Sequence, residues 1–212
     1  MVITYLGTEF FKVQFGDIVV ALNPVSKASK QPQSRFGADV ALVSMNDNDM
    51  NGVEMVTHGD TKPFVISGPG EYEVKGVAVR GLQSESQYGG EKKLNTIYLV
   101  SLEGMNLCFL GGLSTKDLKN ETVEALEDID ILFMPIGGEG VLSPADAYKF
   151  AVNLEPKLII PMHYGNVGDK DALKKFLKEA GEEGVKAEEK LTLKKKDLEG
   201  KEGDIAVLAP QA

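Results

Sequence analysis

The strongest constraint on the fold of this chain is a change of hydrophobic pattern about halfway along it. In the first half, short runs of β-branched and aromatic residues alternate with turn residues, which is typical of β-strands. This half is therefore predicted to be almost entirely β-structure. The predicted strands cover residues 2–5, 10–15, 18–22, 40–43, 64–66, 72–80 with a break at Lys75-Gly76, 96–102 and 105–110.

In the second half, helical patterns alternate with short apolar strands. Helices are predicted over residues 115–127, 143–154 and 169–179, and strands over residues 131–134, 158–160 and 205–208. Ser143 followed by Pro144 marks a helix start, and Asp169 is a second candidate cap, for a helix that ends near Gly181. We therefore predict one α/β domain over residues 1–212, in which two apposed sheets carry helices outside, as an αββα four-layer sandwich.

Charge and hydropathy exclude several classes of partner. The 32 acidic and 23 basic residues give a formal charge of -9, which repels nucleic acid. The basic run at residues 194–196 has no aromatic partner and is flanked by glutamates, which favours a solvated surface over a phosphate-binding patch. No apolar stretch is long enough to cross a membrane, and the first residues lack a signal-peptide layout, so a cytoplasmic protein is predicted.

Few residues are available for catalysis by side chains. The single cysteine, Cys108, lies in an apolar run and is predicted to fill core, so an intramolecular disulfide or a cysteine-based zinc site is excluded. Only two histidines exist. His163 follows an apolar strand, where α/β folds collect functional side chains, and is either a site residue or a capped structural histidine. His58 enters a Gly-Asp turn and is predicted to lie at the surface.

A loop rich in oxygen ligands follows the predicted strand at residues 40–43. Asp47, Asp49, Asn51 and Gly52 match the opening of a calcium loop. His58 stands where that loop needs a bidentate glutamate, and the preceding element is a strand, so an Asx-rich turn is the competing interpretation. The glycine clusters near other strand ends form neither a dinucleotide fingerprint nor a P-loop and predict tight turns: Gly68-Pro69-Gly70, Gly111-Gly112 and Gly137-Gly138-Glu139-Gly140.

Several segments taken together resemble one family. They are residues 6–12 with Phe15-Gly16, residues 38–44, residues 67–73 with Gly76, and residues 95–98, 109–113, 131–138 and 160–164. With these segments the chain resembles the metallo-β-lactamase-fold superfamily, and within it the small bacterial branch of metal-dependent hydrolases. The resemblance implies an αββα sandwich with a metal site at the rim of the two sheets.

The metal-ligand positions depart from the pattern of that family. Family members carry H-x-H-x-D-H after the strand in the first half, and these positions here hold Met45, Asn46, Asp47, Asn48, Asp49 and Met50. Only Asp49 matches. The bridging aspartate of the family falls at Gly112, and a histidine common near the start falls at Thr8, whereas the terminal histidine survives as His163. The methionines are bulky and apolar, and we expect them to fill the vacated cavity.

The resemblance and the missing ligands lead to two functional hypotheses. The first is a degenerate member, a pseudoenzyme without a bound cofactor, that keeps the hydrolase scaffold to bind a small molecule or a protein partner, with homo-oligomers left open. The alternative is a metal-dependent hydrolase with a rebuilt mononuclear site, in which Asp49 and His163, with Asp47 as a substitute ligand, hold one weakly bound zinc or manganese ion. Asp49 and His163 would then be the catalytic residues. A structural calcium ion at the oxygen-rich loop is a third, weaker hypothesis.

Overall fold

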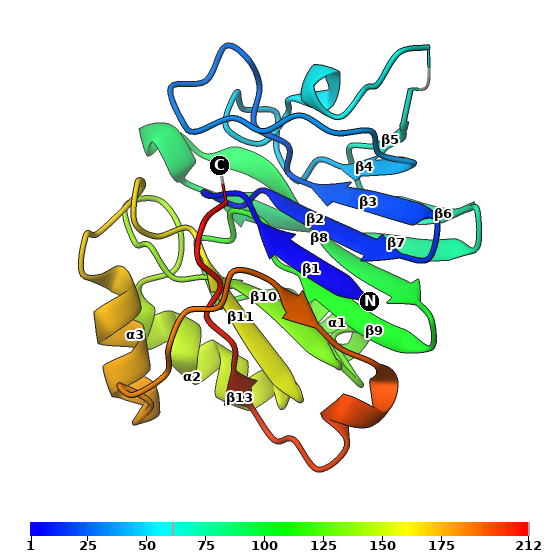
Figure 1. Ribbon diagram of the computed structural model, residues 1–212. Helices are drawn as coiled ribbons and strands as arrows, with labels where there is room; N and C mark the ends of the chain where they lie inside the picture. The colour runs from blue at the N-terminus through cyan, green and yellow to red at the C-terminus, as the bar shows by residue number, and fades with distance from the viewer. Residues whose placement is uncertain (61, 212) are drawn as a thin grey trace.

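Two β-sheets lie face to face and enclose the main core (Figure 1). The computed structural model describes residues 1–60 and 62–211. The first sheet has the order β12-β1-β2-β3-β4-β5 and the second has the order β13-β11-β10-β9-β8-β7-β6. In the first sheet the strands are β1 (Val2–Tyr5), β2 (Phe11–Phe15), β3 (Ile18–Leu22), β4 (Val40–Leu42), β5 (Phe64–Ile66) and β12 (Leu191–Thr192). In the second sheet they are β6 (Gly70–Val74), β7 (Val77–Ser86), β8 (Lys93–Leu102), β9 (Met105–Phe109), β10 (Ile131–Pro135), β11 (Leu158–Met162) and β13 (Asp204–Ile205).

The burial of each strand follows from what covers its two faces. Strands β10 and β11 are parallel and buried along their whole length, because helices cover their outer face. Strand β7 instead alternates between buried and exposed residues over most of its length, as expected for a strand with one open face. Cys108 on β9 is fully buried, as predicted, and burial raises the pKa of its thiol well above the ordinary range.

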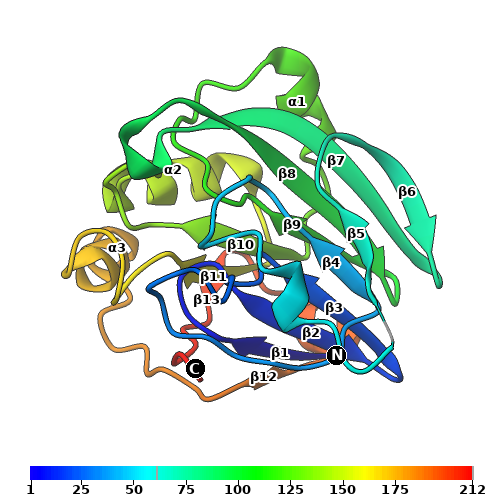
Figure 2. The same cartoon turned by 90° about the horizontal axis from the view of Figure 1, so that it is seen from above.

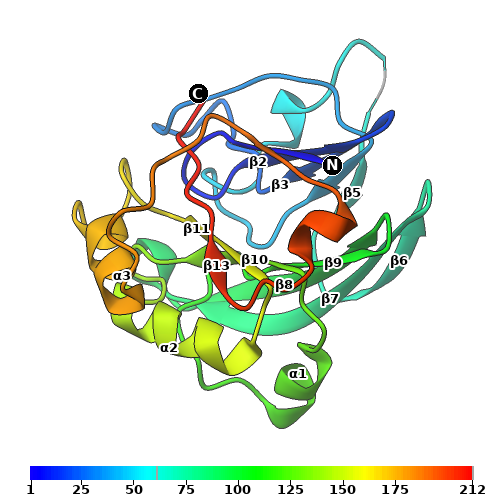
Figure 3. The same cartoon turned by 60° about the horizontal axis from the view of Figure 1, so that its bottom comes forward.

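Different structures cover the outer faces of the two sheets. Helices α1 (Asn120–Ala125), α2 (Pro144–Leu154) and α3 (Ala172–Ala180) lie on the side of the second sheet (Figures 2 and 3). On the first sheet, residues 23–39 and residues 43–57, the latter with the 3-10 turn η1 (Val53–Met55), arch over a second, smaller core. That core contains Leu6, Phe10, Ala21, Val25, Ala38, Ala41 and Val56, with Val19 and Phe36 packed against it. The layered sandwich is confirmed, with a loop layer in place of helices over this sheet in the described part of the chain.

The predicted helix starts have mixed outcomes. Ser143 is the N-cap of α2, and its side chain accepts a hydrogen bond from the backbone N–H of Asp146, with Pro144 as the first helical residue. The predicted cap at Asp169 is wrong, because the N-cap of α3 is Asp171. Asp169 accepts a hydrogen bond from the backbone N–H of Asp171 at 2.8 Å, which forms a turn before the helix begins.

Two further predictions of element bounds are wrong. The helix predicted over residues 115–127 is reduced to Asn120–Ala125, because Thr115 Oγ1 accepts a hydrogen bond from the backbone N–H of Asp117 and holds a local turn. The last strand is Asp204–Ile205, shorter than predicted, and the two-residue strand β12 beside β1 was not predicted. In the part of the chain that is described, no helix is long and apolar enough to span a membrane.

Candidate functional site

Polar residues gather at one rim of the sandwich, where several strands end. Glu9 follows β1, Asn23 follows β3, Ser44 follows β4 and His163 follows β11. Carboxyl ends of strands are where α/β folds collect functional side chains, because the loops that follow approach one another there. The prediction that His163 lies at such an end is confirmed. No sequence pattern indicated a role for Glu9, Asn23 or Ser44, although Asn23 and Ser44 directly follow predicted strands and Glu9 directly precedes one.

These four residues form one buried hydrogen-bond network, here called the Glu9 network. The side chains of Glu9 and His163 are both 0% exposed, and Glu9 Oε1 lies 2.8 Å from His163 Nδ1. Asn23 Nδ2 donates to Glu9 Oε2 at 2.7 Å and to Ser44 Oγ at 2.8 Å, and Asn23 Oδ1 accepts from the backbone N–H of Ser44. Both oxygens of the Glu9 carboxylate are therefore satisfied by side chains of this chain.

The backbone at this rim is strained at three non-glycine residues. Thr8, Asn23 and His163 have φ angles of 54°, 42° and 59°, in the left-handed region that glycine adopts most readily. The backbone N–H of His163 donates to the carbonyl oxygen of Thr8 at 2.6 Å, which joins the two sheets at this point. Such conformations cost on the order of 1–3 kcal/mol each and often gather at functional sites.

The two aspartates predicted as ligands are engaged with other side chains. The carboxylate of Asp49 accepts hydrogen bonds from the hydroxyls of Ser29 and Tyr88. The carboxylate of Asp47 forms an ion pair with Lys93 at 2.7 Å and also accepts from the backbone N–H of Asp49 at 3.0 Å. Both carboxylates therefore already have partners, which come from the loop itself, from Ser29 between β3 and β4, and from the β7–β8 hairpin.

Tyr88, at the tip of the β7–β8 hairpin in the 3-10 turn η2 (Tyr88–Gly90), lies between the aspartate loop and the buried histidine. Its ring meets that of His163 edge to face, with centroids 5.1 Å apart, while its hydroxyl donates to Asp49. Burial, followed by the Asp49 hydrogen bond, raises the pKa of Tyr88 well above the ordinary range. Asp49 and His163 are thus both in contact with Tyr88, and no hydrogen bond joins them to each other among the described residues.

Methionine side chains fill the surrounding space. Met45 is 3% exposed and Met50 is fully buried. A Cβ atom added to Gly112 would lie 3.0 Å from the Met45 methyl and 3.6 Å from Glu9 Oε1. A side chain at the position that the resemblance assigns to a bridging aspartate therefore requires Met45 to move.

The donors at this rim do not fit a zinc or manganese ion as they are arranged. Among residues 1–60 and 62–211, no group of three or more His, Cys, Asp or Glu residues could hold a metal ion. Among the described histidine, cysteine and carboxylate atoms, which are those that commonly bind zinc, only His163 Nε2 is buried without a hydrogen-bond partner. A protein zinc site needs three or four such donors. The site predicted from Asp47, Asp49 and His163 stays a prediction.

The oxygen-rich loop has the contacts of a closed turn. The carbonyl oxygen of Asp47 accepts from the backbone N–H groups of Met50 and Asn51, and Asn51 Nδ2 donates to Asn46 Oδ1. A Cβ on Gly52 would lie 2.3 Å from backbone atoms of the facing segment, so close packing explains this glycine. These contacts favour the Asx-rich turn over a calcium loop. His58, beyond it, is exposed, as predicted, and directly precedes the turn at Gly59-Asp60.

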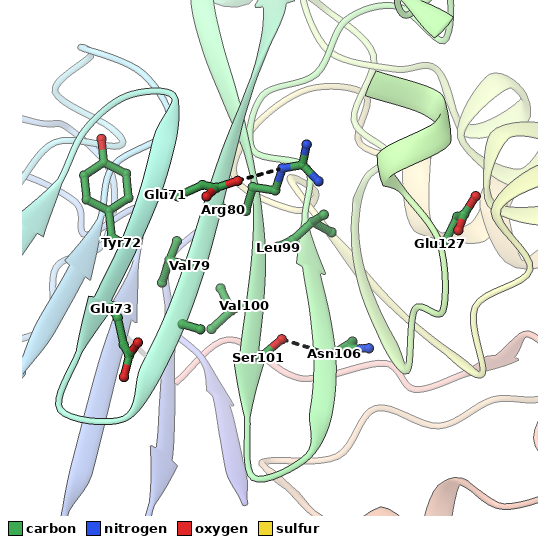
Figure 4. Close-up of a pocket in the computed structure, with 11 residues that line it drawn as sticks. Glu71, Tyr72, Glu73, Val79, Arg80, Leu99, Val100, Ser101, Asn106 and Glu127 are labelled. Atoms are coloured by element: carbon green, nitrogen blue, oxygen red, sulfur yellow. Dashed lines mark hydrogen bonds and ion pairs between the residues drawn. The ribbon is translucent and has the colours of Figure 1, made fainter. Parts of the chain in front are cut away.

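A groove of about 530 Å³ lies elsewhere, on strands β6–β9 of the second sheet (Figure 4). The Glu71–Arg80 ion pair and the Ser101–Asn106 hydrogen bond cross it, and both are at exposed positions. None of its lining residues belongs to the Glu9 network.

Comparisons with known proteins agree on the family. The model of the β-lactamase superfamily domain matches residues 2–163, which is more than half of the chain. A UPF0173 metal-dependent hydrolase of Pelotomaculum thermopropionicum is 24% identical over 200 residues, covering 77% of this chain and 84% of its own length. A UPF0173 metal-dependent hydrolase of Lysinibacillus sphaericus is also 24% identical, covering 77% of this chain and 85% of its own.

Among solved structures, a metallo-β-lactamase superfamily protein of Thermotoga maritima aligns with a TM-score of 0.75 at 26% identity, covering 98% of this chain and 99% of its own. The matched model spans both sheets and ends at His163 itself. The relatives carry the name of metal-dependent hydrolases. The chain belongs to the metallo-β-lactamase superfamily, in the branch of the UPF0173 metal-dependent hydrolases.

Proposed function

We propose that this chain is a pseudoenzyme of its superfamily, which keeps the hydrolase scaffold to bind a small molecule or a protein partner and does not hydrolyse through a metal ion. The observation that carries this proposal is the Glu9 network. At the rim where the family holds metal ligands, the polar side chains bond to one another: Glu9 to His163 and to Asn23. These bonds occupy both oxygens of the Glu9 carboxylate, so within the network His163 Nε2 is the metal-binding atom left without a partner among the described residues.

Metal-dependent hydrolysis requires donors that the Glu9 network and the Asp47 ion pair already occupy. The ion must be held by at least three protein donors and keep an open position, where it lowers the pKa of a bound water to about 7. Recruiting Glu9 or Asp47 here would break a hydrogen bond or ion pair that already satisfies it. Met45 offers only a thioether, a soft donor that suits copper better than a hydrolytic ion.

One observation favours the alternative, a hydrolase with a mononuclear site. His163 Nε2 is buried and has no partner among the described residues, as expected of a nitrogen that binds a ligand. In this alternative Asp49 must turn from Ser29 and Tyr88 toward His163. The two hypotheses therefore differ in whether metal binding depends on both Asp49 and His163.

Metal content, measured by mass spectrometry, tests the proposal. The protein is purified without a histidine tag, incubated with zinc, manganese or calcium, and dialysed. We expect no tightly held ion, and no difference between the wild type and the Asp49→Ala or His163→Ala variants. His58→Ala is the matched control, because His58 is the other histidine and is exposed.

Two results would overturn the proposal. One is about one ion per chain that is retained by wild type and by His58→Ala and lost in both Asp49→Ala and His163→Ala. The other is hydrolysis of a phosphodiester or ester that both site variants abolish. Either result would establish the mononuclear hydrolase instead.

A further inference from the structure

Three cations lie on the loop layer that covers the first sheet. Residues 18–38 contain Lys27, Lys30 and Arg35 and no carboxylate, although the chain as a whole carries a formal charge of -9. All three are exposed. Lys12 on β2 joins them, because its Nζ lies 5.2 Å from the centre of the Phe36 ring in the same loop. We call these four residues the basic arch.

Carboxylates offset the positive charge of the basic arch only in part, since those of Asp49 and Glu54 accept hydrogen bonds from residues 26–29 of the same loop. In the described parts of the chain, none of its four residues forms an ion pair. The nearby carboxylate of Asp39 is paired with Lys75. Glu54 accepts hydrogen bonds from Ser26 Oγ and from the backbone N–H of Lys27, so it offsets only part of the charge of Lys27.

The backbone beneath these cations is held in place at several points. The backbone N–H of Ser26 donates to the carbonyl oxygen of Asn48 at 2.8 Å, and Gln33 Nε2 donates to the carbonyl oxygens of Lys27 and Ser29. The Phe36 ring stacks on Phe10 of the smaller core, with centroids 5.6 Å apart. A preformed backbone lowers the entropy that a partner must remove on binding.

We propose that the basic arch binds an acidic peptide segment of a partner protein. Spaced cations on an ordered loop complement an extended chain that carries several carboxylates. The inference goes beyond the proposed function, since it concerns the outer face of the first sheet and holds whether or not the Glu9 network binds a metal.

Two other anions fit the basic arch less well. A nucleic acid is usually held by aromatic side chains that stack on its bases, and the aromatic ring of this loop, Phe36, stacks on Phe10 of the smaller core instead. A single phosphate is bound best by converging backbone N–H groups, and those of Ala28 and Gln31 already donate to Ser26 Oγ and Ser29 Oγ.

Fluorescence anisotropy with a labelled hexaglutamate peptide, at low salt, tests the proposal on the full chain. The variant Lys27→Gln/Lys30→Gln/Arg35→Gln removes three charges from the basic arch. Lys194→Gln/Lys195→Gln/Lys196→Gln removes three exposed charges elsewhere and is the matched control. We expect the arch variant to weaken binding about tenfold and the control less than about twofold, because exposed ion pairs each contribute modestly. Circular dichroism and thermal unfolding establish that both variants are folded.

Several outcomes would overturn the proposal. If the two variants lose the same affinity for hexaglutamate, binding follows net charge alone. If wild type does not bind hexaglutamate, the basic arch is not a peptide site. A single-stranded oligonucleotide of similar charge that binds more tightly than hexaglutamate would identify a nucleic-acid surface. Competition by inorganic phosphate at a concentration too low to change ionic strength would identify a phosphate site. None of these outcomes depends on metal content, so they are independent of the pseudoenzyme proposal.

Discussion

Removing the Glu9 carboxylate tests whether the Glu9 network stabilises this rim of the sandwich. In Glu9→Ala, His163 Nδ1 loses its partner inside the protein, and Asn23 Nδ2 keeps only Ser44 Oγ. An orphaned buried donor costs about 1–3 kcal/mol, the lost hydrogen bond to a charged group about 1.5 kcal/mol, and the cavity about 1 kcal/mol. Together these terms lower the free energy of unfolding by about 4 kcal/mol.

Glu9→Gln is the matched control because it keeps the size of the side chain. Its amide oxygen can accept from Asn23, and its amide nitrogen can donate to His163 Nδ1 when the ring proton lies on Nε2. Every hydrogen bond of Glu9 then has a replacement. We expect Glu9→Gln to cost about 1 kcal/mol, well below the alanine variant.

Urea denaturation measures both effects. The chain has no tryptophan, so far-ultraviolet circular dichroism and tyrosine fluorescence are the two probes, and coincident transitions establish two-state unfolding. The free-energy difference follows from the shift in midpoint at constant slope. The reasoning is refuted if Glu9→Ala costs less than about 1 kcal/mol, or if the alanine and glutamine variants are equally destabilised.

Three further predictions concern packing, burial and pH. Gly112→Ala should be destabilising because the added Cβ meets the Met45 methyl at 3.0 Å, and Met45→Ala should relieve part of that cost, with a coupling of about 1 kcal/mol in a double-mutant cycle. Diethylpyrocarbonate should modify His58 and leave His163 unmodified, as read by peptide mass spectrometry; equal modification would contradict the burial of the site. Burial raises the pKa of Asp39, but hydrogen bonds from a lysine and a backbone N–H outweigh it and hold the pKa below 3.8. The ionised Asp39 carboxylate therefore stabilises the fold above pH 3.8, and this stabilisation is lost as pH falls through the lowered pKa. Between pH 6 and pH 3, the free energy of unfolding should fall more in wild type than in Asp39→Asn. Equal falls in the two proteins would contradict this prediction.

Sequence pattern predicted the strands and helix starts that depend on interactions between residues close together in the chain. Alternating burial and turn residues were enough to predict most strands, and a serine followed by proline was enough to predict the start of α2. The short helix α1 shows the limit, because Thr115 begins a local turn that competes with the helix. Strand β12 has only two residues and exists because β1 pairs with it, so no local signal announces it.

By itself, the sequence determined that this chain has the strands and helices of a metallo-β-lactamase sandwich, that His163 ends a buried strand, and that the usual ligand histidines are missing. Only the tertiary structure decided what stands in their place. Glu9 and His163 are 154 positions apart, yet their side chains meet, because β1 and β11 end at the same rim of the two sheets. Which buried polar groups satisfy one another depends on how distant segments pack, and hydrophobic periodicity carries no information about that.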